Sequence, residues 1–132
     1  MKSVETIIQQ EPVFLHNWKH AFDVLSSFSS SVSCAKYKEF ADSLKDTTLL
    51  FCTYSFGSYD GSAWVLLTKD GKLYEVNGGH CSCYGLEGQW EPEEVTLEAI
   101  KHRIENGSFG KGDYFEPFDK ELREFIGLPY AM

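Results

Sequence analysis

The chain has 132 residues, about the size of one ordinary domain, and 42% of them are hydrophobic, so we expect a single folded domain over residues 1–132. This composition excludes a disordered tail, for which low hydrophobicity is typical. The 20 acidic and 12 basic residues give a net charge of -8. That charge argues against direct binding to the phosphates of nucleic acid.

The location of the protein is predicted from what the sequence lacks. The first residues, Met1 to Glu5, contain no apolar segment of a signal peptide, and no apolar run approaches the ~20 residues of a membrane span. We therefore expect a cytoplasmic protein that makes no membrane contact. Its four cysteines are expected to be thiols, because a reducing compartment opposes disulfide formation.

The N-terminal part of the chain has the apolar spacing of helices. From Pro12 to Phe28, apolar residues recur every three or four positions, which predicts an amphipathic helix. A serine-rich stretch then ends this helix. The same spacing predicts a second, shorter helix, which contains Tyr37, Phe40 and Leu44.

The middle of the chain has the composition of strands. Strand-forming residues dominate 48–56, 63–68 and 73–76, and turn residues separate these segments. The pair Asp70-Gly71 suits a tight hairpin turn. We therefore predict a three-stranded antiparallel β-meander, with the N-terminal helices covering one of its faces.

Two short helices are predicted in the C-terminal part. Thr96 is expected to cap a helix whose buried side carries Leu97, Ile100 and Ile104. Asp119 is expected to cap the last helix, which ends near Gly127. The predicted fold class is α+β: a three-stranded antiparallel β-meander packed against N-terminal helices, with two short C-terminal helices.

The densest group of metal-binding residue types is His80, Cys81 and Cys83. A structural zinc site needs four ligands, so this group supplies only part of one, and Cys34 or Cys52 would have to approach it. Free cysteines are usually packed as small apolar side chains, and we favour that interpretation. Zinc at this group is the alternative.

The same group could also hold a reactive thiol. Cys81 or Cys83 would be the nucleophile, with His80 or His102 as the base and Asp60 orienting it, because a cysteine nucleophile needs a base nearby. The sequence around the two cysteines has no family-specific signature of such chemistry. A small metal- or thiol-dependent enzyme centred on His80, Cys81 and Cys83 is therefore the alternative function.

A third group of possible ligands lies in the predicted first helix. His16, His20 and Asp23 would share the side of that helix opposite its apolar side. The pair of histidines lacks the glutamate that follows the first histidine in zinc enzymes. We interpret the three as a solvated polar surface.

Acidic residues are concentrated between positions 87 and 98, where five glutamates occur without a basic residue. Carboxylates near a helix start are favoured by the helix dipole, which is one explanation. The other is an acidic surface that binds a basic protein surface and imitates nucleic acid. For that function the candidate residues are Glu91, Glu93, Glu94 and Glu98.

Further candidates for the same interface come from the neighbouring loops. Tyr59, Tyr84 and Trp90 are expected to be exposed or half-exposed anchors, since aromatic residues dominate interface energetics. Asp60 is included because loop tips often present binding groups.

The middle third of the chain resembles a group of small proteins encoded by bacteriophages and prophages. The resemblance rests on GSYDGSA at 57–63, DGKLYEVN at 70–77, and HCSCYGL at 80–86 with the segment through Trp90. It implies an accessory protein in the host cytoplasm that binds and inhibits or redirects a host protein. Such targets include CRISPR effectors and restriction enzymes, so the implied partner is a nucleic-acid-binding host protein. We expect a monomer or homodimer, and a structural subunit is a further possibility.

Overall fold

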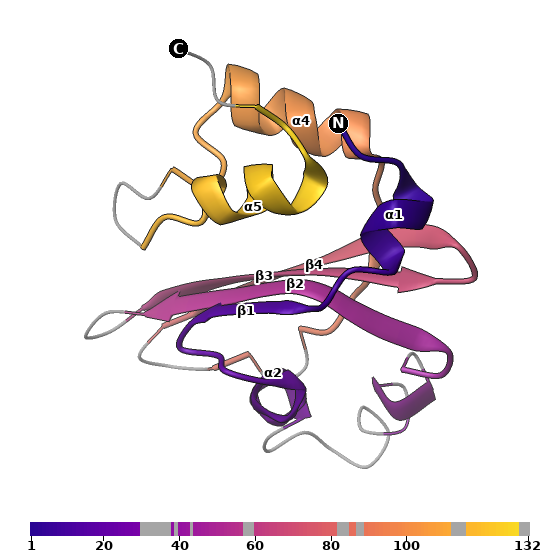
Figure 1. Cartoon of the computed structure of the whole chain (residues 1–132). Helices are drawn as coiled ribbons and strands as arrows, with labels where there is room; N and C mark the ends of the chain where they lie inside the picture. Colours follow the sequence, from indigo (N-terminus) through magenta and orange to yellow (C-terminus); the bar gives the residue numbers. More distant parts are fainter. Residues whose placement is uncertain are drawn as a thin grey trace.

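The fold is built on a five-stranded sheet (Figure 1). The computed structural model describes residues 1–29, 38, 40–42, 44–56, 60–81, 85–86, 89–111 and 116–129. In spatial order the strands are β1 (Val13–His16), β2 (Thr47–Phe56), β3 (Gly61–Lys69), β4 (Lys72–His80) and β5 (Glu93–Glu94). The overall class is α+β, but the prediction of a three-stranded sheet is wrong.

The two unpredicted strands lie at the two edges of the sheet. Strands β2, β3 and β4 form the expected antiparallel meander in its centre. β1 is added parallel to β2, and β5 antiparallel to β4, so the sheet is mixed. β5 consists of two glutamates, a residue type that is depleted in strands, and pairing with β4 outweighs that weak local preference.

The predicted helix from Pro12 to Phe28 is wrong over its first half. Residues Val13–His16 form β1, and the helix α2 covers only Ala21–Ser29. His16 has a φ of 61°, a left-handed conformation that interrupts regular structure at the end of the strand. An additional helix, α1 (Val4–Ile8), begins at Ser3, whose side chain accepts a hydrogen bond from the Thr6 amide.

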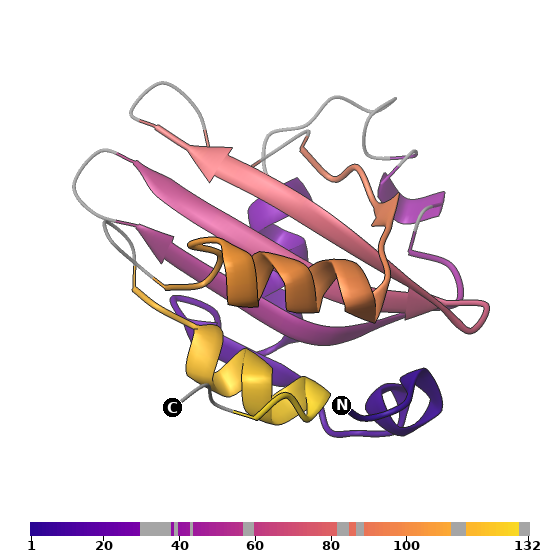
Figure 2. The same ribbon diagram turned by 90° about the horizontal axis from the view of Figure 1, so that it is seen from above.

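Helices cover both faces of the sheet, whereas the sequence predicted one covered face. α2 lies on one face, and α4 (Leu97–Asn106) and α5 (Asp119–Ile126) lie on the other (Figures 1 and 2). β3 directs Trp64 and Leu66 into the core on the α4–α5 side and Val65 and Leu67 into the core on the α2 side. A strand covered on both faces is expected to contain a continuous apolar run, as β3 does from Ala63 to Leu67.

The two C-terminal helices occur where they are predicted. The Thr96 hydroxyl accepts a hydrogen bond from the Ala99 amide at 3.1 Å, which confirms the predicted cap of α4. The cap of α5 was predicted wrongly: Phe118 occupies that position, and no side chain accepts a hydrogen bond there. Within the described part of the chain, no helix has the length and apolar character needed to cross a membrane.

Candidate functional site

The four candidate glutamates lie within eight positions of the chain, on and beside β5 at one edge of the sheet, where Glu93 and Glu94 point to opposite faces. Glu93 and Glu94 are β5, which pairs with Glu75 and Tyr74 of β4, and Glu98 lies in the first turn of α4. These three and Glu91 are all exposed. We call Glu91, Glu93, Glu94 and Glu98 the acidic surface.

The acidic surface lacks an ion-pair partner in the described part of the chain, although the charge of Glu93 interacts at longer range with Arg103. Among the described residues, none of the four carboxylates forms an ion pair with a lysine, arginine or histidine. Glu98 lies in the first turn of α4, where the helix dipole favours a carboxylate. Because Glu93 and Glu94 are in a hydrogen-bonded strand, their backbone positions are fixed relative to the sheet.

A half-buried ion pair lies behind the acidic surface. The two Nη atoms of Arg103 each donate to one oxygen of Glu75 at 2.7 Å, and the indole Nε1 of Trp64 donates to Glu75 Oε1 at 2.8 Å. The hydrogen bonds from Arg103 lower the pKa of Glu75, although burial of the carboxyl opposes this shift. The same contact raises the pKa of Arg103, with a smaller contribution from the charge of Glu93. Arg103 is therefore already committed to Glu75.

This ion pair was not predicted from the sequence, although the positions of Glu75 and Arg103 in the sequence indicate it. In a strand, Glu75 must lie on the same face as Leu73, which belongs to the core beneath α4. On α4, Arg103 follows buried Ile100 by three positions, so it lies on the same side of the helix. Two opposite charges that both face one core are a signal for such a pair.

The expectation that Trp90 is an exposed anchor is wrong. Its side chain is only 9% exposed and packs edge-to-face against Phe28 of α2 at 5.1 Å and against Phe40 at 5.5 Å. Burial in this aromatic cluster removes more apolar area from water than a position on the rim of an interface would.

The other predicted anchors are described only in part. Tyr59 and Tyr84 lie outside the described residues. Asp60 is half-buried, and its Oδ1 is buried without a hydrogen-bond partner among the residues described. Whether these residues contact a partner stays a prediction.

The structure places part of the predicted metal group at the end of β4. His80 is the last residue of that strand, and half-buried Cys81 follows it. Cys83 and Cys34 lie outside the described residues. In the described part of the chain, no three His, Cys, Asp or Glu side chains are arranged to hold a metal ion. Zinc at His80, Cys81 and Cys83 stays a prediction.

Cys52 does not belong to that group. It pairs across the sheet with Val65, which pairs with Val76, and Cys81 lies five residues further along the chain. At about 3.3 Å per residue this separation is roughly 16 Å, far beyond the size of one metal site. Burial raises the pKa of the Cys52 thiol well above its usual range, so Cys52 is a packed core residue.

The three polar residues of the predicted first helix do not form one surface. His16 Nδ1 lies 2.6 Å from Glu116 Oε2, and its Nε2 lies 2.9 Å from the carbonyl oxygen of Pro117. His20 instead contacts Asp23 at 3.2 Å. His16 therefore connects the end of β1 to the segment that leads into α5, and it is not part of a solvated helix surface.

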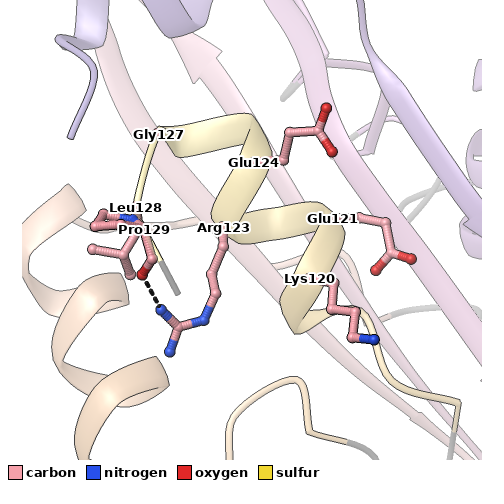
Figure 3. A pocket seen from close by; sticks show the side chains of 7 residues that line it. All are labelled: Lys120, Glu121, Arg123, Glu124, Gly127, Leu128 and Pro129. Atoms are coloured by element: carbon pink, nitrogen blue, oxygen red, sulfur yellow. Dashed lines mark hydrogen bonds between the residues drawn. The ribbon is translucent and has the colours of Figure 1, made fainter. Parts of the chain in front are cut away.

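Residues that the structure describes form a hollow on each of two sides of α5. The first, about 580 Å³, is drawn in Figure 3 and is lined by Lys120, Glu121, Arg123, Glu124, Gly127, Leu128 and Pro129. Arg123 Nη1 donates to the Pro129 carbonyl oxygen at 2.7 Å. The second, about 410 Å³, lies between α5 and the residues around the start of β1.

Comparisons with known proteins identified no related protein. No protein-family model matches the chain, and neither a curated protein nor a solved structure is significantly similar to it.

Proposed function

We propose that this protein is a non-enzymatic interaction protein whose acidic surface binds a basic surface of another protein. The observation that carries the proposal is the acidic surface itself. Four exposed carboxylates lie on β5, the start of α4 and the segment before them, and none forms an ion pair with a described cation.

The placement of these charges suits recognition of a basic surface. Long-range attraction between opposite charges speeds the encounter of two proteins, and it also selects against partners of the same sign. Because two of the glutamates are in a paired strand and one is in a capped helix, little backbone freedom would be lost on binding.

The resemblance to small phage proteins supports a specific class of partner. We propose a host protein that binds nucleic acid, such as a CRISPR effector or a restriction enzyme. The acidic surface would occupy the basic groove that normally takes nucleic-acid phosphates. The protein would then inhibit or redirect that host protein in the host cytoplasm.

Charge reversal tests this proposal. The variant Glu91→Lys/Glu93→Lys/Glu94→Lys would be compared with Glu5→Lys/Asp42→Lys/Asp46→Lys, which changes the net charge equally at exposed positions elsewhere. Purified Cas9-type effectors and restriction endonucleases would be screened for loss of DNA binding in gel-shift assays, with circular dichroism to verify folding.

The expected result depends on position and not only on charge. We expect the first variant to lose inhibition by about tenfold or more, and the control variant to stay within a few-fold of the wild type. Equal loss in both variants would show that only net charge matters. Full inhibition by the first variant would show that another surface binds the partner.

A further inference from the structure

The second edge of the sheet differs from the acidic one. β1 is the last strand on the side opposite β5, and all four of its residues are half-exposed. Its sequence, Val-Phe-Leu-His, contains no lysine, glutamate or proline, the residues that usually protect an edge strand from pairing. The β5 edge, in contrast, carries Glu93 and Glu94.

The backbone of β1 leaves pairing groups on its outer side. β1 and β2 are parallel, with His16 opposite Tyr54, and the Asn17 amide donates to the Tyr54 carbonyl oxygen at 2.9 Å. In a parallel ladder alternate residues of a strand bond to one neighbour, so the N–H and C=O of Phe14 point away from β2. No strand in the described part of the chain pairs with this side.

The hollow of about 410 Å³ adjoins the beginning of this edge. Val13 and Phe125 supply apolar walls, and the exposed carboxylates of Glu11, Glu121 and Glu124 also line it. Glu121 and Glu124 also line the first hollow, and Figure 3 shows their carboxylates pointing away from the Arg123 guanidinium.

Lys2, which also lines this hollow, already forms hydrogen bonds. The ammonium of Lys2 donates to the Gln10 side chain and to the Glu124 carbonyl oxygen. Three carboxylates therefore face one ammonium, and the lining keeps a negative charge. Apolar walls below carboxylates fit the aliphatic stem and charged end of a lysine or arginine side chain.

We propose that the β1 edge binds an extended basic polypeptide segment of another protein. The segment adds to the sheet as a strand beside Val13–His16 and places a lysine or arginine side chain in the hollow. This inference goes beyond the proposed function, because it concerns the opposite edge of the sheet from the acidic surface.

The charge of the protein favours such a partner over a second copy of the chain. Two copies that paired through β1 would bring two acidic hollows together, each in a chain of net charge -8. Like charges at an interface oppose association, whereas a basic segment is attracted to the same place.

Peptide binding tests the inference. The probe is a fluorescein-labelled eight-residue peptide of alternating lysine and valine, measured by fluorescence polarisation. A second peptide carries N-methyl groups on alternate backbone amides, which prevents strand pairing, and a third replaces lysine with glutamate. The protein variants are Glu121→Lys/Glu124→Lys and the matched control Asp42→Lys/Glu105→Lys, at exposed positions outside both the hollow and the acidic surface.

We expect the lysine–valine peptide to bind and to shift the amide resonance of Phe14, while the other two peptides do not bind. The Glu121→Lys/Glu124→Lys variant should weaken binding about tenfold or more, whereas the control should bind within a few-fold of the wild type. Urea unfolding of each variant separates loss of binding from loss of folding.

Three outcomes would overturn the inference. One is equal affinity for the N-methylated peptide, which would show that no strand is added. Another is equal weakening in the two double variants, or no binding at millimolar peptide. The third is a dimer in sedimentation equilibrium that Phe14→Pro dissociates, which would make a second copy the occupant. None of these outcomes depends on the acidic surface.

Discussion

Arg103 and Glu75 form a two-pronged ion pair that connects α4 to the central meander. Both nitrogen–oxygen distances are 2.7 Å, and the Glu75 residue is only 5% exposed, while the Arg103 side chain is 38% exposed. The guanidinium also lies 5.6 Å from the centre of the Phe109 ring. The pair therefore combines charge, geometry and packing between elements distant in the sequence.

The variant Arg103→Met should destabilise the protein. It leaves the buried carboxylate of Glu75 with only the Trp64 indole and Asn77 side chain as donors. The expected loss is about 1–3 kcal/mol of unfolding free energy in urea titrations, moderated by the partial exposure of Arg103. The control is Lys101→Met on the exposed side of the same helix, which should change stability by about 0.5 kcal/mol or less. A similar effect of both variants would contradict a special role for the pair.

The contribution of Glu75 should depend on pH. Because its pKa is lowered in the folded protein, its stabilisation is fully present above the ordinary glutamate value of about 4.3 and is lost as the pH falls through the folded pKa. Unfolding free energies of the wild type and Glu75→Gln should therefore differ most near neutral pH and converge below about pH 4. A difference that stays constant down to pH 3 would show that charge is not involved.

Cys52 should be unreactive in the folded protein. Its burial raises the pKa of the thiol, and each unit of increase reduces the thiolate fraction about tenfold at a given pH. Peptide mapping after iodoacetamide treatment at pH 8 should show Cys52 alkylated more than about tenfold faster in urea than in buffer. Rapid alkylation of Cys52 in buffer would mean that the α2 side of the core opens readily.

A side chain at the glycine that ends α5 should destabilise the protein. Gly127 has a φ of 77°, and an added Cβ would lie 2.6 Å from Cγ and 3.0 Å from the backbone nitrogen of Lys2. Gly71→Ala is the matched control, since its φ of 78° is similar but nothing lies within 4 Å of the added atom. Both should lose about 1 kcal/mol of stability from the left-handed conformation, and Gly127→Ala should lose roughly 1 kcal/mol more. Equal losses would show that the N-terminus moves away at no cost.

Local signals in the sequence predicted several elements correctly. The Asp70-Gly71 turn needs two residues that accept positive φ, and their φ values are 55° and 78°. The Thr96 cap needs a hydroxyl ahead of a helix. The acidic surface was also found in advance as a charged segment, and its glutamates are exposed. In each case the interacting groups are only a few residues apart.

The apolar spacing gave a wrong prediction for residues 13–16, where the sequence is compatible with both a helix and a strand. Val13, Phe14 and Leu15 suit a helix or a strand, and pairing with β2, more than thirty residues away, decides for the strand. The number of strands therefore depended on contacts that the local pattern does not contain.

By itself, the sequence determined the α+β class, the central meander, the capped helix α4 and the run of acidic residues, because neighbouring residues carry those signals. Only the tertiary structure decided that both faces of the sheet are covered, that Trp90 is buried, and that Arg103 is committed to Glu75. It also left β1 at an open edge beside an acidic hollow. These features arise from packing between distant segments, where burial and charge pairing outweigh local preference.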